Sequence, residues 1–217
     1  MPFFSKKTAL LVIDVQQGFD DPKWGPRNNP EAEANIARLI AQWRSSGRPI
    51  IFIQHASASI DSPLHPSKPT AAIKEMVAPM GDEPVFTKRV HSAFIGTPLE
   101  AYMRAQTIDG VVIVGLTTDH CVSTTTRMAS DLGFNTAIVS DATATFDREG
   151  PGKIIYPAAQ VHELALVNLH DEFATVLDTE AVISYCHLDK KTRPFHSCDD
   201  GMLGVKPAAG RERTLSL

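Results

Sequence analysis

The sequence predicts an α/β protein: a mainly parallel, Rossmann-like sheet of about six strands between two layers of helices. Two observations predict it. Short apolar runs recur along the chain, and helix-like segments separate them. Parallel strands with both faces buried read as such apolar runs, so the helices are expected to cover both faces of the sheet.

The first strand and helix are the most clearly marked elements. The run ALLVID (9–14) is expected to be a strand, and a helix is expected from Pro30, at a first helical position, to Gly47, a typical stop. Apolar residues recur in this segment at helical spacing: Ile36, Leu39, Ile40 and Trp43. A second strand, PIIFIQH (49–55), precedes a Pro- and Ser-rich surface loop.

The remaining elements repeat the alternation. A short helix is expected at about 70–77, and TPLE (97–100) has the order of a capping box, with Thr97 as N-cap and Glu100 at the third helical position. Cys121 is expected to open a helix that runs to Leu132. The other expected elements are strands at 84–88, 110–115, 134–141 and 174–178, and helices at 98–106 and 156–173.

Composition divides the chain and excludes some functions. Residues 1–186 are expected to form one domain, and 187–217 a polar appendage that is mobile or packed on a neighbouring subunit. A formal charge of −4 with no basic stripe argues against nucleic-acid binding. The first apolar run is too short for a signal peptide or a membrane span, which predicts a cytoplasmic protein without a membrane partner. Three cysteines without CxxC spacing suggest neither a disulfide framework nor a thiolate zinc site.

Chemically useful side chains are expected at the carboxyl ends of the strands, where open parallel sheets bind ligands. Asp14, Lys88 and Cys121 each follow an apolar strand. Singly, an Asp reads as a cap, a Lys as a solvated end and a Cys as core. Together they specify a mechanism, because a helix N-terminus and an ammonium stabilise a thiolate while a carboxylate takes its proton.

Three segments carry a family resemblance: LLVIDVQQGF, FTKRVHSAFIGTPLE and VVIVGLTTDHCVSTTTRMASDLGFNTAIVSDATAT. From about Thr8 to Asp178 the chain resembles the isochorismatase-like cysteine hydrolases, which include nicotinamidases, N-carbamoylsarcosine amidohydrolases and ureidoacrylate or biuret hydrolases. The resemblance implies a Cys-Asp-Lys triad, which falls on Cys121, Asp14 and Lys88. It also implies a cis peptide between Leu116 and Thr117.

The resemblance implies cleavage of a C–N bond in a small amide, ureide or lactam through a thioester on Cys121. The backbone N–H groups of Thr117 and Cys121 would form the oxyanion hole. Two alternatives remain. Some members of the family cleave a vinyl ether without a thiol nucleophile, and a non-catalytic oligomeric binding protein could keep the fold. The resemblance also implies a homo-oligomer, such as a dimer or tetramer, with a small molecule as its other partner.

No cofactor and no metal are expected. Nicotinamidases of the family hold a metal through an Asp-x-His pair after the second strand, which this chain lacks. His55, Asp61 and His65 are spread over a Ser-rich loop and make a weak pattern. His120 is expected to face away from the site. The expected substrate wall consists of Gln16, Phe19, Trp24, His55, Phe94, Ile95 and Thr118.

Overall fold

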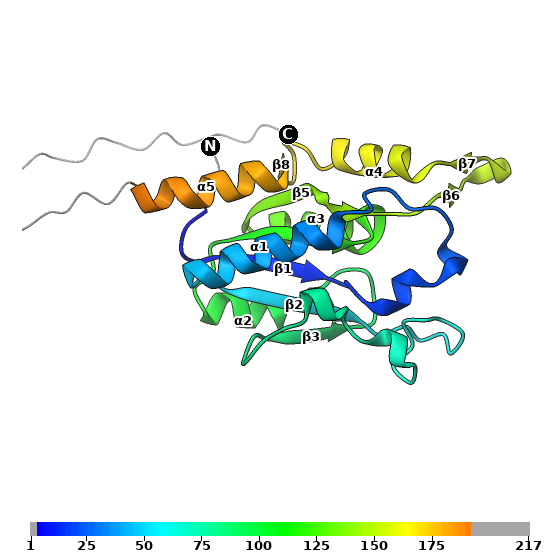
Figure 1. Cartoon of the computed structure of the whole chain (residues 1–217), viewed down its shortest axis with the longest axis horizontal. Coiled ribbons are helices and arrows are strands. Elements are labelled where there is room, and N and C mark those ends of the chain that lie inside the picture. The colour runs from blue at the N-terminus through cyan, green and yellow to red at the C-terminus, as the bar shows by residue number, and fades with distance from the viewer. Residues whose placement is uncertain (1–3, 192–217) are drawn as a thin grey trace, which may run out of the picture.

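The computed structural model describes residues 4–191 of the 217-residue chain. Six parallel strands form one sheet in the order β3-β2-β1-β4-β5-β8 (Figure 1). The strands are β1 Thr8–Ile13, β2 Ile50–His55, β3 Val85–Lys88, β4 Gly110–Leu116, β5 Asn135–Ala144 and β8 Thr175–Leu177. The predicted fold class is confirmed.

Helices cover both faces of this sheet (Figure 1). One face packs against α1 (Ala32–Ser46) and α5 (Thr179–Lys191), and the other packs against α2 (Leu99–Ala105), α3 (Ser123–Asp131) and α4 (Ala158–Val167). Strand β1 serves both layers because successive side chains point to opposite faces. Leu10 and Val12 join the cluster under α1, while Leu11 and Ile13 join the cluster on the opposite face.

Strand register brings the polar strand ends together. In the pairing of β1 with its two neighbours, Ile13 lies opposite Ile53 of β2 and Gly115 of β4. In the next pair, His55 lies opposite Lys88. The carboxyl ends of these strands therefore meet at one edge of the sheet, where the sequence predicts the site.

Some elements differ from the sequence prediction. Helix α1 begins at Ala32 rather than Pro30, because the Asn29 side chain donates to the carbonyls of Ser140 and Thr143 and holds the chain in a turn before the helix. Residues 70–77 form no helix. Two 3-10 turns, η3 (Pro69–Ala71) and η4 (Glu75–Val77), take their place because the intervening backbone bonds the chain after β1: Gln17 N–H donates to the Ala72 carbonyl, and Lys74 N–H donates to the Val15 carbonyl.

Two further features lie in the C-terminal half of the described chain. A short antiparallel pair, β6 (Arg148–Glu149) and β7 (Ile155–Tyr156), follows β5 and has no counterpart in the prediction. Helix α5 continues through Lys191, and the rest of the predicted appendage lies outside the described residues. Within residues 4–191, no helix combines the length and apolar character that crossing a bilayer requires.

Candidate active site

The Lys88 ammonium lies at the centre of the predicted triad. Its Nζ is 2.6 Å from Asp14 Oδ2, 3.2 Å from Cys121 Sγ and 3.2 Å from His55 Nδ1. An ammonium has three N–H groups, so each can be directed at one of these atoms. Both Lys88 and Asp14 have fully buried side chains. The structure thus brings the three predicted catalytic residues into direct contact and adds His55 to them.

Asp14 reaches this position through the conformation of its backbone. The chain leaves β1 with φ of 53° at Asp14, a left-handed conformation that Asp tolerates better than most residues. Its N–H still bonds the Ile53 carbonyl of β2 at 2.9 Å, so the residue stays fixed to the sheet. The carboxylate is therefore held by both the strand end and Lys88.

Cys121 is placed by an irregular turn rather than by the start of a regular helix. The turn η5 (Thr118–Val122) has π-helical hydrogen bonding and precedes α3, which begins at Ser123. A cis peptide joins Leu116 to Thr117 immediately before this turn, at the bond that the family resemblance implies. Thr117 and Cys121 both line the same cavity, as an oxyanion hole built from their N–H groups requires.

Burial dominates the acid–base character of the site. Burial, with the negative charge of Asp14 adding to it, raises the pKa of Cys121 to about 12 despite the nearby Lys88. Burial also raises the pKa of Asp14 above its usual value, although the Lys88 charge and hydrogen bond oppose this. Asp14 Oδ1 is buried and accepts no hydrogen bond of ordinary geometry within the described residues. The resting Cys121 is therefore a thiol, with the Asp14 carboxylate beside it as the group that can accept its proton.

His55 is neutral in this environment. Burial, followed by the positive charge of Lys88, lowers its pKa to about 4. Neutral His55 can accept a hydrogen bond from Lys88 through Nδ1, whereas a protonated imidazole cannot. His55 thus helps to hold the ammonium between Asp14 and Cys121.

The possible metal ligands do not suit a metal ion. Within the described residues, Asp14, His55 and Cys121 are the group whose donor atoms converge, lying within 4.8 Å of one another. The Lys88 ammonium is already within hydrogen-bond distance of all three, so a divalent ion would have to displace a buried cation. His65 Nδ1 pairs with Ser67 instead, and the Asp61 carbonyl accepts from Lys23. The His55, Asp61 and His65 set does not converge.

A cavity of about 150 Å³ opens above Cys121. Of the predicted wall residues, Phe19, Trp24 and His55 line it. The Phe19 and Trp24 rings pack with centroids 5.3 Å apart, and both stack on Phe146, at 6.0 and 5.8 Å. The two aromatic rings therefore anchor their loop and form the apolar wall at the same time.

The other predicted wall residues lie elsewhere. Gln16 is buried behind the cavity, where its amide bonds the backbone of His55 and Ala71. Phe94 stacks on Phe134 in the core, because the loop after β3 folds inward there, and the next residue, Ile95, is 52% exposed. Thr118 is fully buried and bonds His162 Nδ1 at 2.9 Å, since η5 turns this side chain away from the cavity.

Sequence reasoning missed part of the wall. Leu64, His91, His120 and Arg148 also line the cavity. The sequence predicts that His120 faces away from the site, but η5 places both His120 and Cys121 on the wall. Arg148 lies in β6, in a Gly- and Pro-containing segment that reads as a turn. Arg148 is placed by its contact with Asp119, 29 residues away in the sequence, so no local pattern in the sequence indicates its position.

Asp119 fixes Arg148 in the wall. Arg148 Nε donates to Asp119 Oδ2 at 2.7 Å, and Nη2 donates to Oδ1 at 3.2 Å. Burial opposes ionisation of Asp119, but hydrogen bonds from Arg148 and Thr145 lower its pKa to about 2. The pair is therefore ionised at neutral pH.

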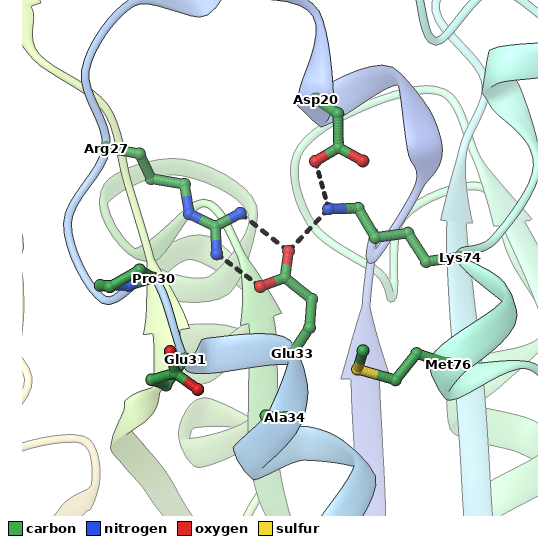
Figure 2. A pocket seen from close by; sticks show the side chains of 8 residues that line it. All are labelled: Asp20, Arg27, Pro30, Glu31, Glu33, Ala34, Lys74 and Met76. Atoms are coloured by element: carbon green, nitrogen blue, oxygen red, sulfur yellow. Dashed lines mark hydrogen bonds and ion pairs between the residues drawn. The ribbon is translucent and has the colours of Figure 1, made fainter.

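A chain of ion pairs, buried except at Asp20, holds the loop that carries Phe19 and Trp24. Glu33, at the start of α1, pairs with Arg27 and with Lys74, and Lys74 also pairs with Asp20 (Figure 2). Burial opposes ionisation of Glu33, yet hydrogen bonds from Arg27 and Lys74 lower its pKa to about 2. This chain borders a separate open hollow of about 540 Å³.

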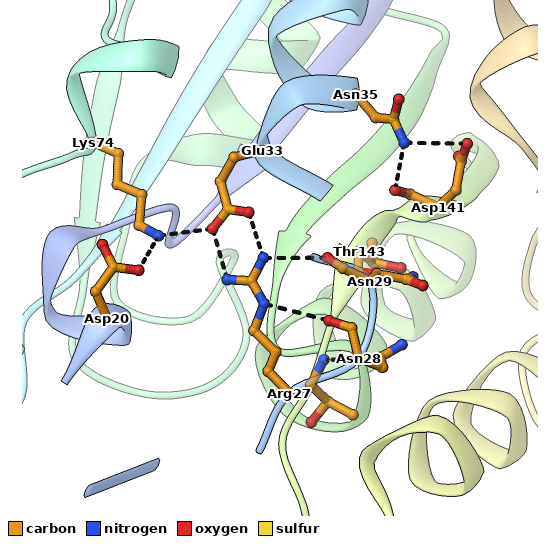
Figure 3. A network of polar contacts seen from close by, with 10 residues as sticks. Asp20, Arg27, Asn28, Asn29, Glu33, Asn35, Lys74, Asp141 and Thr143 are labelled. Atoms are coloured by element: carbon orange, nitrogen blue, oxygen red, sulfur yellow. Dashed lines mark hydrogen bonds and ion pairs between the residues drawn. The ribbon is translucent and has the colours of Figure 1, made fainter. Parts of the chain in front are cut away.

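Asparagine side chains attach the neighbouring residues to the C-terminal part of β5 and to Thr145, which follows it. Asn29 bonds the carbonyls of Ser140 and Thr143, and Asn35 bonds Asp141 (Figure 3). The Asn28 side chain accepts from the backbone N–H of Thr145. These hydrogen bonds connect the loop that carries Phe19 and Trp24 to the segment that leads to Arg148.

Comparison with known proteins agrees with this fold. The model of the isochorismatase domain matches residues 8–181. An isochorismatase family protein of Bacillus subtilis, YrdC, is 50% identical over 82% of this chain and 96% of its own length. The maleamate amidohydrolase of Pseudomonas putida is 30% identical over 64% of this chain and 72% of its own.

Solved structures of isochorismatase-family proteins have the same fold as this chain. An isochorismatase-family protein of Chromobacterium violaceum superposes with a TM-score of 0.83 at 39% identity, covering 87% of this chain and 97% of that one. An isochorismatase of Pseudomonas putida superposes with a TM-score of 0.76 at 32% identity, covering 83% and 93%. Since the domain match spans most of the chain and YrdC aligns over nearly its whole length, the chain belongs to the isochorismatase family.

Proposed function

We propose that this member of a hydrolase family cleaves the C–N bond of a small amide, ureide or lactam through a thioester on Cys121. The observation that carries the proposal is the contact of one buried ammonium, Lys88, with both Asp14 and Cys121 at the base of a cavity. Relatives named maleamate amidohydrolase, nicotinamidase and streptothricin hydrolase support C–N chemistry.

The order of proton transfers follows from the pKa shifts. Because the Cys121 pKa is about 12, the thiol loses its proton to Asp14 as sulfur attacks the carbonyl carbon, rather than beforehand. Lys88 stabilises the negative charge while it passes from carboxylate to sulfur and then to the carbonyl oxygen. That oxyanion would bind the N–H groups of Thr117 and Cys121, where loss of one donor costs about 10²- to 10³-fold in rate.

Collapse of the tetrahedral intermediate breaks the C–N bond. The proton held by Asp14 passes to the departing nitrogen, so ammonia or an amine leaves and the carboxylate is restored. Water then attacks the thioester carbonyl, gives its proton to Asp14, and releases the carboxylic acid. Asp14 finally returns a proton to Cys121, which balances the cycle.

The test is ammonia or amine release from a panel of small amides, ureides and lactams, with the acyl-enzyme sought by intact mass measurement. Cys121→Ala should abolish turnover, while Cys186→Ala, at the other described cysteine, should retain it. Undiminished turnover by Cys121→Ala would refute the proposal. Cleavage of isochorismate by Cys121→Ser would instead indicate the vinyl ether reaction. The expected dimer or tetramer stays a prediction, which light scattering on the purified protein can measure.

A further inference from the structure

We propose that Arg148 is a specificity-determining residue and that the substrate is a small amide or ureide that also carries a carboxylate. This inference rests on the proposed function, since it names the class of substrate for the same cavity. It starts from Arg148, the formally positive residue of the cavity lining, whose counter-ion Asp119 lies outside the lining.

Two formally charged residues line the cavity, Asp14 and Arg148. Lys88 pairs with Asp14 at 2.6 Å, and Asp119 pairs with Arg148; neither partner lines the cavity. His55, His91 and His120 also line it. The lining therefore carries no formal excess of charge, and a preference for an anion depends on Arg148, since Asp119 binds only two of its three nitrogen atoms.

Arg148 is held in a fixed orientation. Asp119 binds Nε and Nη2, and Nη2 also lies 3.3 Å from Thr117 Oγ1 and 3.2 Å from Thr145 Oγ1. The third nitrogen, Nη1, has no partner within the described residues. A guanidinium fixed on one side with an unpaired N–H₂ group on the other can bind a carboxylate without first ordering a flexible side chain.

The contacts of Arg148 also place it close to the nucleophile. Nη2 touches Thr117, the residue after the cis peptide, and lies 3.4 Å from Nδ1 of His120, the residue before Cys121. In a cavity of about 150 Å³, well below the usual size for drug-sized ligands, a bound carboxylate would be only a few bonds from the carbonyl at Cys121. Short monoamides of dicarboxylic acids have this spacing.

The apolar part of the wall limits the choice further. Phe19, Trp24 and Leu64 supply apolar surface, so the part of the substrate between its two carbonyl groups should be a short hydrocarbon. Arg148 would then bind the carboxylate at one end of the substrate, while Cys121 attacks the carbonyl carbon at the other end. Neutral amides of the same size would leave Arg148 Nη1 without a charged partner and bind less well.

The experiment compares matched anionic and neutral substrates: succinamate with succinamide, and maleamate with maleamide. Ammonia release gives kcat/KM for each. The wild type should prefer the monoanionic amide, and Arg148→Met should reduce the ratio of the two kcat/KM values by roughly 10- to 100-fold, mainly through KM for the anion. Arg148→Lys should restore part of the preference. Arg38→Met removes an exposed arginine of the same type and should leave the ratio unchanged.

The outcomes separate the two proposals. Equal losses for anionic and neutral amides in Arg148→Met would show that Arg148 only supports the fold, and a wild-type preference for the neutral amides would overturn the inference directly. Either result leaves Cys121-dependent hydrolysis intact. Absence of any amide turnover in the wild type, with Cys121 never acylated, would instead refute the proposed function and this inference with it.

Discussion

The Lys88 ammonium and the Asp14 carboxylate form an ion pair of 2.6 Å in which neither side chain is exposed to solvent. Such a pair is costly to break from one side because the remaining charge stays buried. The same contact that supports the proposed chemistry therefore also affects folding.

We expect Lys88→Met to lower the free energy of unfolding by about 3–5 kcal/mol, since it leaves Asp14 buried without its cation. Urea unfolding followed by tryptophan fluorescence measures this change. Adding Asp14→Asn to the Lys88→Met variant removes the orphan charge and should recover part of the loss. A double variant less stable than Lys88→Met alone would contradict this account.

Glu33 offers a test of the ionic chain under the aromatic wall. Glu33→Gln removes the shared partner of Arg27 and Lys74, so we expect a loss of about 3 kcal/mol in unfolding free energy. Trypsin should also cleave after Lys23 faster, because the loop is less firmly held. Glu180→Gln, at an exposed pair with Arg38, should change stability by less than about 0.5 kcal/mol. Unchanged cleavage in Glu33→Gln would show that Asn28 and Asn29 suffice to hold the loop.

The close approach of the β4 backbone to the β1 backbone beside the site depends on Gly115. Its φ is 120°, and a Cβ there would lie 2.0 Å from the Ile13 carbonyl oxygen. Gly115→Ala should therefore destabilise the protein by more than about 4 kcal/mol, or prevent folding. Gly133→Ala is the matched control: its φ is also positive, at 82°, but a Cβ would meet no atom within 4 Å. The control should cost only about 1–2 kcal/mol, and similar losses for both variants would contradict the steric explanation.

His55 should make stability depend on pH. Its folded pKa of about 4 lies below the ordinary value of 6.5, so between these values the unfolded chain binds more protons than the folded one. Stability due to His55 is therefore fully present above about pH 6.5 and decreases as pH falls toward 4. His55→Gln should reduce the slope of unfolding free energy against pH in this window by up to about 1.4 kcal/mol per pH unit. If the unfolding free energy changed with pH equally in the wild type and in His55→Gln, the lowered pKa of His55 would be contradicted.

Strand-end residues were predictable because parallel topology fixes where they lie. Asp14 and Lys88 end apolar strands, and register alone brings those ends to one edge. Arg148 was not predictable, since its place depends on Asp119 and on a short antiparallel pair of strands. Phe94 and Ile95 were expected in the wall, but the direction of each side chain depends on how one loop folds.

His120 shows a second kind of limit. A regular helix beginning at Cys121 would turn His120 away, whereas the π-helical turn η5 places both residues on the cavity. Hydrogen bonds of this irregular kind leave no periodic signal in the sequence. The prediction for His120 was therefore wrong because its position depends on one irregular turn.

The protonated state of Cys121 has a consequence for the chemical durability of the protein. With a pKa of about 12, only about one thiol in 10⁵ is ionised at pH 7. Peroxides and general alkylating reagents react with thiolates, so they should modify Cys121 slowly even though it is the proposed nucleophile. In the proposed mechanism, a carbonyl compound that fits the cavity and draws the proton onto Asp14 makes the sulfur reactive, so the residue should resist oxidation between turnovers.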